Sequence, residues 1–260
     1  MRFALIDNKK TEAESGLSGF CPGCLQAVIA KCGNQRIHHW AHRSNKMCDS
    51  WWEPETEWHR SWKNYFPADW QEVFFIDKST SEKHIADVRS EHGLVIEFQH
   101  SHINPQERII REKFYKNMVW VVDGTRLKRD YPRFLKGQKD SFKYTDIKNS
   151  FFVDYPDECF PSEWIESLVP VIFDFKGITI PTEPLDIMKE TLWCLLPGRV
   201  GRYAILLTIL RDDFLNLILI NPYLFPMPAH KIVDLFATNH RKQQKSQENQ
   251  RRRIRRSFRF

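Results

Sequence analysis

Two acidic residues interrupt apolar segments in the middle of the chain. Asp87 lies in the segment HIADVRS and Glu97 lies in the segment GLVIEFQ. Burial of a carboxylate is costly unless the group is paired with a positive charge or binds a cation. Because side chains alternate along a strand, Glu97 and Gln99 are expected on one face. A turn at Gly93 predicts a hairpin that brings Asp87 beside them.

Two carboxylates on neighbouring strands can hold one divalent ion. Oxygen ligands of this kind favour Mg²⁺ or Mn²⁺ over metals that prefer thiolates. Such an ion polarises a phosphodiester and lowers the pKa of a coordinated water. We therefore expect Asp87 and Glu97 to hold Mg²⁺ or Mn²⁺ for phosphodiester hydrolysis. Taken alone, the two acids are better explained as edge-strand charges or as ion-pair partners of Arg89 or Arg111.

The residues before these strands, 53–67, predict a helix with further polar candidates. Its aromatic residues recur at three- and four-residue spacing, which is typical of one apolar face. Glu57 on this helix is placed to add a third carboxylate or to position a water. His59 and Lys63 share a face and are candidates for phosphate contact, although a solvated helix face is the simpler interpretation of both.

The order of predicted elements indicates the fold class. Strands are expected at 70–77, 84–90 and 93–99, followed by a helix at 105–117 and a strand at 118–124. A hairpin pairs two strands antiparallel, whereas a helical crossover favours parallel pairing. The order of helix, three strands, helix and strand therefore predicts an α/β core with a mixed sheet.

The later part of the chain is less regular. Residues 184–197 predict a helix. The apolar stretch 202–225, which Arg211 and two aspartates interrupt, predicts either a buried helix or a pair of strands. Residues 239–260 predict a charged helix or a disordered tail.

The first 52 residues are short and rich in Cys, His and Trp, and short strands with a turn between them are expected at 3–6 and 27–33. Cys21 and Cys24 form a CxxC pair, a spacing that places two thiolates on one Zn²⁺. The best supply of further ligands is His39, His42 and Cys48, with His38 and Cys32 also in reach. A structural metal suits this module, since about 50 residues rarely supply enough core alone. The alternative is a metal-free module whose histidines pack beside Trp40 or face DNA.

Positive charge is concentrated at the end of the chain. The formal net charge is +6, of which residues 241–260 carry +8 and residues 1–240 carry −2. A basic tail beside nuclease-like residues favours contact with a polyanion, and Arg252 and Arg255 are candidates for it. A solubilising or localising tail is an equal alternative.

The sequence contains no sign of a membrane location. No apolar run reaches the roughly 18–20 residues that a membrane span needs. The first residues also lack the apolar stretch of a secretory signal. We therefore expect a cytoplasmic protein without membrane contact.

The ordered motifs resemble the competence protein CoiA-like family. They run from CPGC and HHWAH through ETEWHRSWK, HIADV and VIEFQHS to an Arg-x-x-x-Tyr helix at Arg111 and Tyr115, and end in MVWVVDG. The resemblance covers residues 20 to about 125. It implies a zinc-finger-like N-terminal module and a PD-(D/E)XK restriction-endonuclease-like core that handles DNA.

The resemblance also implies roles for individual residues. The catalytic set would be Glu57, Asp87, Glu97 and Gln99. Arg111 and Tyr115 would contact nucleic acid, although Tyr115 is as compatible with a core position. In the wider superfamily the position of Gln99 usually holds a lysine. Because Gln offers hydrogen bonds but no charge, Lys63 or His100 is expected to supply part of that function.

Four parts of the chain follow from these patterns. They are a zinc-finger-like module at 1–52, a PD-(D/E)XK-type nuclease domain at 53–135, an α+β C-terminal region at 136–238 and a basic tail at 239–260. The expected function is a metal-dependent DNA nuclease in competence, repair or phage defence, with RNA also compatible as substrate. The alternative is an inactive DNA-binding or adaptor protein that keeps the fold. A protein partner or a homo-oligomer is left open.

Overall fold

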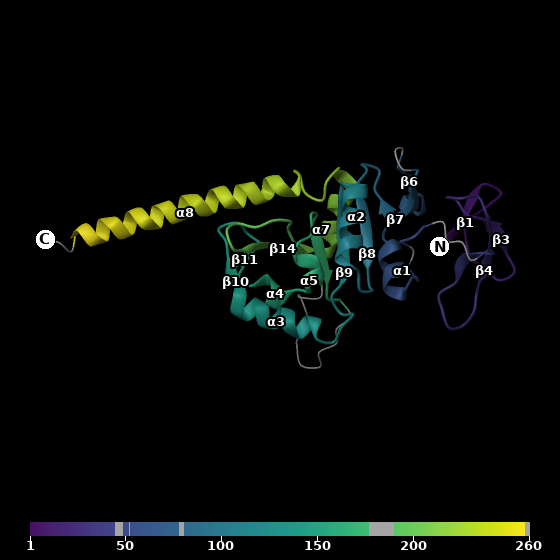
Figure 1. The fold of residues 1–260 in the computed structure, drawn as a ribbon, viewed down its shortest axis with the longest axis horizontal. Helices are drawn as coiled ribbons and strands as arrows, with labels where there is room; N and C mark the ends of the chain where they lie inside the picture. Colours follow the sequence, from purple (N-terminus) through teal and green to yellow (C-terminus); the bar gives the residue numbers. More distant parts are fainter. Residues whose placement is uncertain (45–48, 52, 78–80, 177–189, 258–260) are drawn as a thin grey trace.

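The computed structural model describes residues 1–44, 49–51, 53–77, 81–176 and 190–257. These residues form a mixed α/β protein with one sheet of five strands and one of nine, which confirms the predicted fold class at this level. Figure 1 shows the small sheet at the N-terminal end, the large sheet in the middle and a long helix that runs to the C-terminus. In the part of the chain described here, no helix is both long and apolar enough to cross a membrane.

The small sheet is antiparallel and has the order β2-β1-β3-β4-β5. Its strands are β1 (Phe3–Ile6), β2 (Lys9–Glu12), β3 (Ser18–Phe20), β4 (Ala27–Lys31) and β5 (His39–His42). The two strands predicted at 3–6 and 27–33 are present. The segment between them is more than the predicted turn, because it adds two further strands to the sheet.

The first half of the large sheet follows the predicted order of elements. Helix α1 (Glu57–Lys63) and the short helix η1 (Ala68–Trp70) precede β6 (Gln71–Ile76), β7 (Lys83–Arg89) and β8 (Val95–Gln99), and α2 (Pro105–Tyr115) then leads to β9 (Met118–Asp123). Strands β6, β7 and β8 pair antiparallel. Strand β9 pairs parallel with β8, as a helical crossover requires.

The second half of the chain extends the same sheet. Its elements are α3 (Asp130–Ser141), β10 (Phe142–Tyr144), β11 (Ser150–Val153), α4 (Pro156–Cys159), α5 (Ser162–Ile165), β12 (Val171–Asp174), β13 (Thr191–Leu195), β14 (Ala204–Leu210), α7 (Arg211–Ile220) and α8 (Ala229–Ser257). The sheet order is β10-β11-β14-β13-β12-β9-β8-β7-β6, with β12 parallel to β9. The predicted division at residue 135 therefore falls inside α3 and is not a break in the sheet.

Two predictions for this half are wrong. Residues 191–195, expected in a helix, form strand β13, while 184–189 lie outside the described residues. The stretch 202–225 is neither one helix nor two strands, because β14 passes directly into α7. Apolar runs that are buried on both faces of a sheet resemble buried helices in composition, so their period does not distinguish the two. The charged helix predicted at 239–260 is present as the end of α8.

Helices cover both faces of the large sheet, and alternation along the strands explains how. In β9, Val119 and Val121 belong to one hydrophobic cluster, whereas Trp120 and Val122 belong to the other. The first cluster is completed by α1, α7 and α8. The second is completed by α2, α3, α4 and α5. The large sheet is thus the middle of three layers.

Helix α1 is shorter than predicted and begins at Glu57 rather than near Pro54. Thr56 is its N-cap: its side chain accepts a hydrogen bond from the His59 amide, and the His59 ring accepts one from the Thr56 amide. This capping box fixes the first turn. Residues 53–55 therefore lie outside the helix and contribute to the lining of the site.

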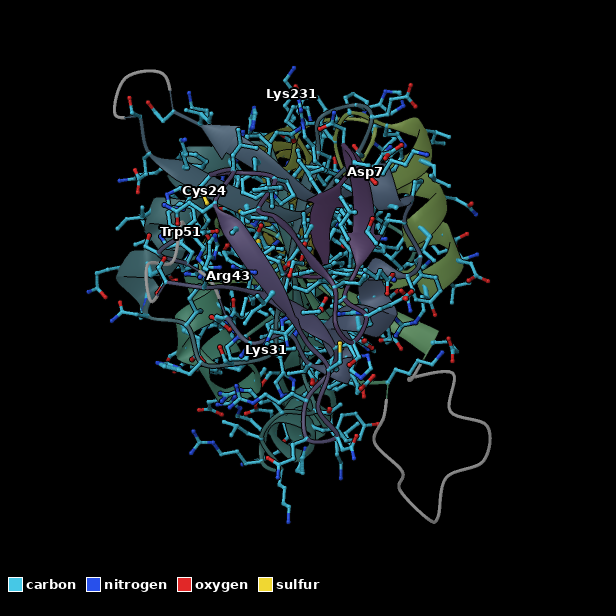
Figure 2. The ribbon with its side chains drawn as sticks, turned by 90° about the vertical axis from the view of Figure 1, so that its right-hand side faces the viewer. Asp7, Cys24, Lys31, Arg43, Trp51 and Lys231 are labelled. Carbon is cyan, nitrogen blue, oxygen red and sulfur yellow. The ribbon has the colours of Figure 1, made fainter. Side chains whose placement is uncertain are left out.

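The small sheet docks against β6 and β7. Phe74 and Ile85 from these strands pack against its core, which includes Cys21 and Trp40. Figure 2 shows the molecule from this end, with the small sheet in front of the rest. A Cβ atom at Gly23 would lie only 1.7 Å from the Phe74 ring, so the CxxC loop approaches β6 as closely as a residue without a side chain allows.

This contact generates a prediction about docking. Gly23→Ala should lower the free energy of unfolding by about 1–3 kcal/mol, because the Phe74 ring or the loop must move. The matched control is Gly33→Ala, since a Cβ there meets nothing within 4 Å. It should change stability by no more than about 0.5 kcal/mol. Equal urea midpoints for the two variants would contradict the close contact between this loop and β6.

Candidate functional site

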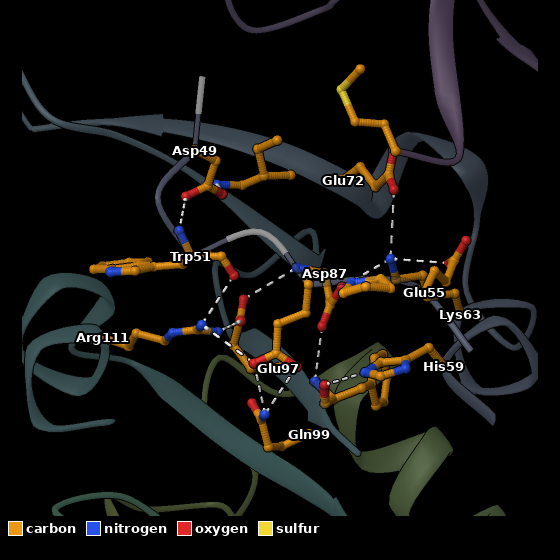
Figure 3. Close-up of a pocket in the computed structure, with 15 residues that line it drawn as sticks. Asp49, Trp51, Glu55, His59, Lys63, Glu72, Asp87, Glu97, Gln99 and Arg111 are labelled. Carbon is orange, nitrogen blue, oxygen red and sulfur yellow. Dashed lines mark hydrogen bonds and ion pairs between the residues drawn. The ribbon is translucent and has the colours of Figure 1, made fainter. Parts of the chain in front are cut away.

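A small cavity of about 70 Å³ lies where α1, β7, β8 and α2 meet the small sheet (Figure 3). Its lining is unusually acidic. The carboxylates are Asp49, Glu53, Glu55, Glu72, Asp87 and Glu97, and the basic groups are His59, Lys63, Arg111 and the N-terminal ammonium of Met1, whose charge acts on Glu72. Acidic groups thus outnumber fixed cations, and an unbalanced set of buried charges favours binding of a cation.

Asp87 stands at a break in the β7–β8 ladder. The ladder pairs Val88 with Ile96, and beyond it the Asp87 carboxylate accepts a hydrogen bond from the Phe98 amide at 3.0 Å. The side chains of β7 stop alternating strictly between its two faces here, since Ala86 and Val88, two positions apart, pack in different clusters. Burial alone would raise the pKa of Asp87, but the Lys63 charge, together with the hydrogen bonds from Lys63 and the Phe98 amide, outweighs burial and lowers it. Asp87 is therefore held as a carboxylate.

Glu97 lies directly beside Asp87 but in a different electrostatic state. One of its oxygens accepts a hydrogen bond from the Asp87 amide at 3.2 Å, and the other lies 3.5 Å from a guanidinium nitrogen of Arg111. Burial raises the pKa of Glu97 well above its ordinary value, and the Asp87 charge raises it further. The two acids, predicted as one pair, are therefore brought together and are electrostatically distinct.

Lys63 is a buried cation among three carboxylates. Its ammonium lies 2.9 Å from Asp87, 3.3 Å from Glu55 and 3.6 Å from Glu72. Burial alone would lower the pKa of Lys63, but the attraction of Asp87, Glu72 and Glu55 outweighs burial and raises it. The solvated-face interpretation of Lys63 does not agree with this geometry, while its contact with phosphate stays a prediction.

Gln99 points to an acidic partner that the sequence did not indicate. Its amide nitrogen donates to the two Glu53 carboxylate oxygens, at 3.0 and 3.2 Å, and to the Ser101 hydroxyl at 3.0 Å. Glu53 precedes α1 and lines the cavity. The Gln99 side chain therefore holds a neighbouring acid in place and brings no charge of its own.

Glu57, predicted as the helix acid of the site, is exposed and does not line the cavity. The carboxylates that reach the cavity from this part of the chain are Glu53 and Glu55. The reason is the later start of α1, since residues 53–55 lie before the helix, outside any helix or strand, and line the cavity. Glu55 is held there by ion pairs with Arg60 and Lys63.

His59 is a structural residue and not a free phosphate contact. One ring nitrogen pairs with the Thr56 hydroxyl at 2.8 Å, and the other pairs with the Phe98 carbonyl at 2.8 Å. Burial lowers the pKa of His59, which favours the neutral ring. His100 lies outside the cavity lining and pairs with Asp123 at 2.7 Å.

The two candidates on α2, Arg111 and Tyr115, are both buried. Arg111 is 5 % exposed; it forms an ion pair with Glu107 and donates to the Trp51 carbonyl at 3.0 Å. Tyr115 is a core residue with ring contacts to Trp51 and Phe75. Arg111 thus orients Glu97, and Tyr115 supports the packing behind it.

Two buried acids of the site were missed by sequence reasoning. Glu72 interrupts the apolar strand WQEVFFID, which is the same signal that singled out Asp87 and Glu97. Its carboxylate accepts hydrogen bonds from the Arg2 amide at 2.7 Å and the Phe3 amide at 3.1 Å. Asp49 accepts one from the Ile85 amide at 2.9 Å and carries no comparable sequence signal.

The predicted thiol site is partly assembled. Ligand atoms of Cys21, Cys24 and His42 lie within 4.8 Å of one another, and the Cys24 sulfur is 3.2 Å from the His42 ring. Two thiolates and an imidazole are the donor set that Zn²⁺ prefers, so these residues fit the ion. Within the described residues, no other group of three Cys, His, Asp or Glu ligand atoms is this close.

His39 is separated from this group by strand geometry. It lies three positions before His42 in β5, and an odd spacing along a strand places two side chains on opposite faces. Its ring instead pairs with the Ile37 carbonyl at 2.8 Å. Cys32 lies near the Ala13 carbonyl at 3.5 Å. Cys48 lies outside the described residues, so the fourth ligand stays open.

Comparison with known protein families finds one match, in the N-terminal part of the chain. Residues 6–50 match the family described as competence protein CoiA, N-terminal domain. The matched segment contains the Cys21, Cys24 and His42 group and reaches Asp49 of the acidic cavity. No curated protein and no solved structure matches the chain. The predicted resemblance to the CoiA-like family is therefore confirmed, while the core beyond residue 50 is outside this match.

The thiol site generates a prediction about zinc. Cys24→Ala and His42→Ala should each reduce bound zinc in the purified protein, because each removes one of three converging ligands. His39→Ala is the matched control and should retain wild-type zinc, since its ring lies on the other face of β5. Elemental analysis would contradict this site if His39→Ala lost zinc while His42→Ala kept it.

The acidic pair generates a prediction about pH. Without divalent ions, Glu97 favours folding below its unfolded pKa near 4.5 and loses that contribution as pH rises, because its folded pKa is raised. Asp87 has a lowered folded pKa, so its contribution is present above the unfolded value near 3.8. Between pH 4.5 and 7, Glu97→Gln should therefore gain stability relative to wild type, and Asp87→Asn should lose it. Thermal unfolding in EDTA measures both, and shifts of the same sign would contradict the assignment.

Proposed function

We propose that this chain, whose residues 6–50 match the CoiA N-terminal domain, is a metal-dependent DNA nuclease with its reaction centre in the acidic cavity. The observation that carries the proposal is the pairing of Asp87 and Glu97 across adjacent strands, at a break in the ladder, in a cavity where acids outnumber cations. The fold itself does not require two acids here, because apolar side chains would fill the position at a lower cost in free energy.

The surrounding topology supports a PD-(D/E)XK-like interpretation of residues 53–135. A helix precedes three antiparallel strands, and a second helix leads to a parallel strand. The two acids come from the second and third of those strands, in the order that the superfamily uses. The fold-level likeness is an analogy, so the activity itself rests on the site and not on the topology.

The acidic residues suit Mg²⁺ or Mn²⁺. Mg²⁺ retains several waters and is commonly bound by only one or two carboxylates, so Asp87 and Glu97 suffice without a third protein ligand. When bound, the ion would polarise the phosphodiester and lower the pKa of a water. Its positive charge would also offset the Asp87 charge, which adds to burial in raising the pKa of Glu97.

The chain's own residues divide the remaining work. Lys63 lies beside Asp87 although it comes from α1, and it can supply the positive charge that Gln99 lacks. Arg111 orients Glu97, and Gln99 orients Glu53 at the mouth. The side chains at the site are thereby fixed before substrate binds, which is the condition for electrostatic catalysis.

The family description suggests the setting in which this activity is used. Members are described as competence proteins. Hydrolysis of DNA during competence, repair or phage defence is compatible with the site, and zinc at Cys21, Cys24 and His42 would have a structural role. RNA is a second possible class of substrate for the same site.

One observation favours a non-catalytic DNA-binding or adaptor function instead. Both acids already have basic partners, Lys63 for Asp87 and Arg111 for Glu97, and Gln99 brings no charge. In an adaptor these ion pairs would be permanent. In a nuclease, binding of the divalent ion would loosen them.

Cleavage assays test the choice between these functions. Single- and double-stranded DNA and RNA are incubated with the protein and Mg²⁺ or Mn²⁺. Asp87→Ala and Glu97→Ala should each reduce cleavage by about 100-fold or more, since each removes a ligand and a fixed charge from the centre.

Glu57→Ala is the matched control. It removes an exposed acid of α1 that does not line the cavity, so cleavage should stay at the wild-type level. Binding without cleavage by the wild type on every substrate would establish the adaptor. Unchanged cleavage by both Asp87→Ala and Glu97→Ala would refute the assignment of the centre.

A further inference from the structure

Strands β3, β4 and β5 of the small sheet have an inner and an outer face. The inner face carries Gly19, Val28 and Trp40, which are buried. Because side chains alternate along a strand, the neighbours of these residues lie on the outer face. We use the name outer face for Ser18, Phe20, Ala27, Ile29, Lys31, His39, Ala41 and Arg43. Figure 2 views the molecule from the end where the small sheet lies, with Lys31 and Arg43 labelled.

An aromatic ring and a guanidinium share one row of the outer face. Phe20 is the register partner of Ala27, and the Arg43 amide donates to the Ala27 carbonyl at 3.3 Å. Phe20 is 56 % exposed although it belongs to a strand, and the small side chain of Ala27 beside it is also exposed. The Arg43 guanidinium donates to the Ser18 hydroxyl at 3.4 Å, so it reaches across β4 towards the strand that carries the ring.

The segment that forms the outer face has positive charge only. Residues 15–44 include Lys31, Arg36 and Arg43 but no Asp or Glu, so their formal charge is +3. All three basic side chains are exposed. Residues 1–240 together carry −2, so this segment differs in sign from the body as a whole. A surface of this kind favours a negatively charged partner.

The combination of ring and charge selects the partner more narrowly than either feature alone. A single exposed aromatic residue is common on protein surfaces and needs no partner. Here Phe20 lies with Arg43 and Lys31 on one face, in a segment without acids. Nucleotides bring a flat base and a phosphate together, so they fit both features. Only unpaired, unstacked bases are free to stack on a protein ring, which favours a single strand over a duplex.

The thiol site holds the ends of the two strands that carry the ring and the guanidinium. Phe20 directly precedes Cys21, and Arg43 directly follows His42. Ligand atoms of Cys21 and His42 lie within 4.8 Å of each other on the inner face. The separation between ring and guanidinium is thereby fixed before a partner binds, which reduces the entropic cost of binding.

The outer face also lies near the acidic cavity. Arg60 on α1 donates to the His38 carbonyl at 3.2 Å and so joins the β4–β5 connection to the helix beside the cavity. Arg43 is six residues before Asp49, which lines the cavity, so their Cα atoms are no more than about 22 Å apart. Because the cavity itself is acidic, a nucleic acid that reaches it needs a positive surface nearby.

We infer that the outer face of the small sheet binds single-stranded nucleic acid, with a base stacked on Phe20 and phosphates paired with Arg43 and Lys31. The inference names the strand form that the protein holds, and so it rests on the proposed function. Binding is measured without cleavage, in buffer without added Mg²⁺, Mn²⁺ or chelator. Loss of this contact would leave the reaction centre in place, and failure of cleavage would leave the contact in place.

The first test compares Phe20→Ala with wild type, using the full chain and a labelled oligothymidine of about 15 nucleotides. Fluorescence anisotropy should show an affinity about tenfold lower, because one base loses its stacking partner. Phe20→Tyr keeps a ring and should bind as wild type. Tyr144→Ala is the matched control, since it removes an 87 % exposed ring from β10, at the edge of the large sheet. It should also bind as wild type.

The second test separates the phosphate contacts from stacking. Arg43→Gln and Lys31→Gln should each lower the slope of log K against log salt by about 0.7, as expected for one phosphate contact on a single strand. Phe20→Ala should leave this slope unchanged. Lys9→Gln is the matched control, because it removes an exposed charge from β2 and not from the outer face, and it should keep the wild-type slope.

Three results would overturn the inference. The first is wild-type affinity for the single strand in Phe20→Ala, or an equal loss in Tyr144→Ala. The second is an equal loss of affinity for a duplex of the same length in Phe20→Ala, since a duplex does not offer its bases for stacking. The third is self-association of the wild type that Phe20→Ala abolishes, without binding of the oligonucleotide, which would make a second copy of the chain the occupant of the outer face.

Discussion

The Lys63 ammonium is surrounded by Asp87, Glu55 and Glu72, and most of the site is organised around it. A buried ammonium costs several kcal/mol unless its partners are held in place. The three acids come from β7, from the segment before α1 and from β6, so this pairing ties three parts of the chain together. Glu72 also accepts the Arg2 and Phe3 amides, which extends the same network to the small sheet.

The small sheet and the large sheet carry different kinds of potential metal ligand. The CxxC loop and β5 gather thiols and an imidazole on the small sheet, which are ligands for Zn²⁺. The large sheet supplies carboxylates, which suit a hard cation that binds reversibly and contacts the substrate. Because the CxxC loop packs on Phe74 in β6, an ion in the first site would hold the small sheet against β6, the strand that supplies Glu72 to the cavity of the second.

Much of this arrangement was predictable from the sequence, and the failures have physical causes. Strand alternation and one hairpin brought Asp87 and Glu97 together, since their neighbours are apolar and the turn is short. Glu57 was chosen because helix propensity alone cannot locate an N-cap, and the cap at Thr56 moves the helix start past Glu53 and Glu55. His39 was chosen by an HxxH spacing that joins ligands on a helix but separates them on a strand.

The central claim is that Asp87 and Glu97 hold a divalent ion, and diffraction from crystals grown with Mn²⁺ tests it most directly. The account predicts an anomalous peak about 2.1 Å from a carboxylate oxygen of each residue, with Lys63 or Arg111 moved away from its partner. Crystals that contain Mn²⁺ elsewhere but keep the Lys63–Asp87 and Arg111–Glu97 pairs, with no peak in the cavity, would contradict it.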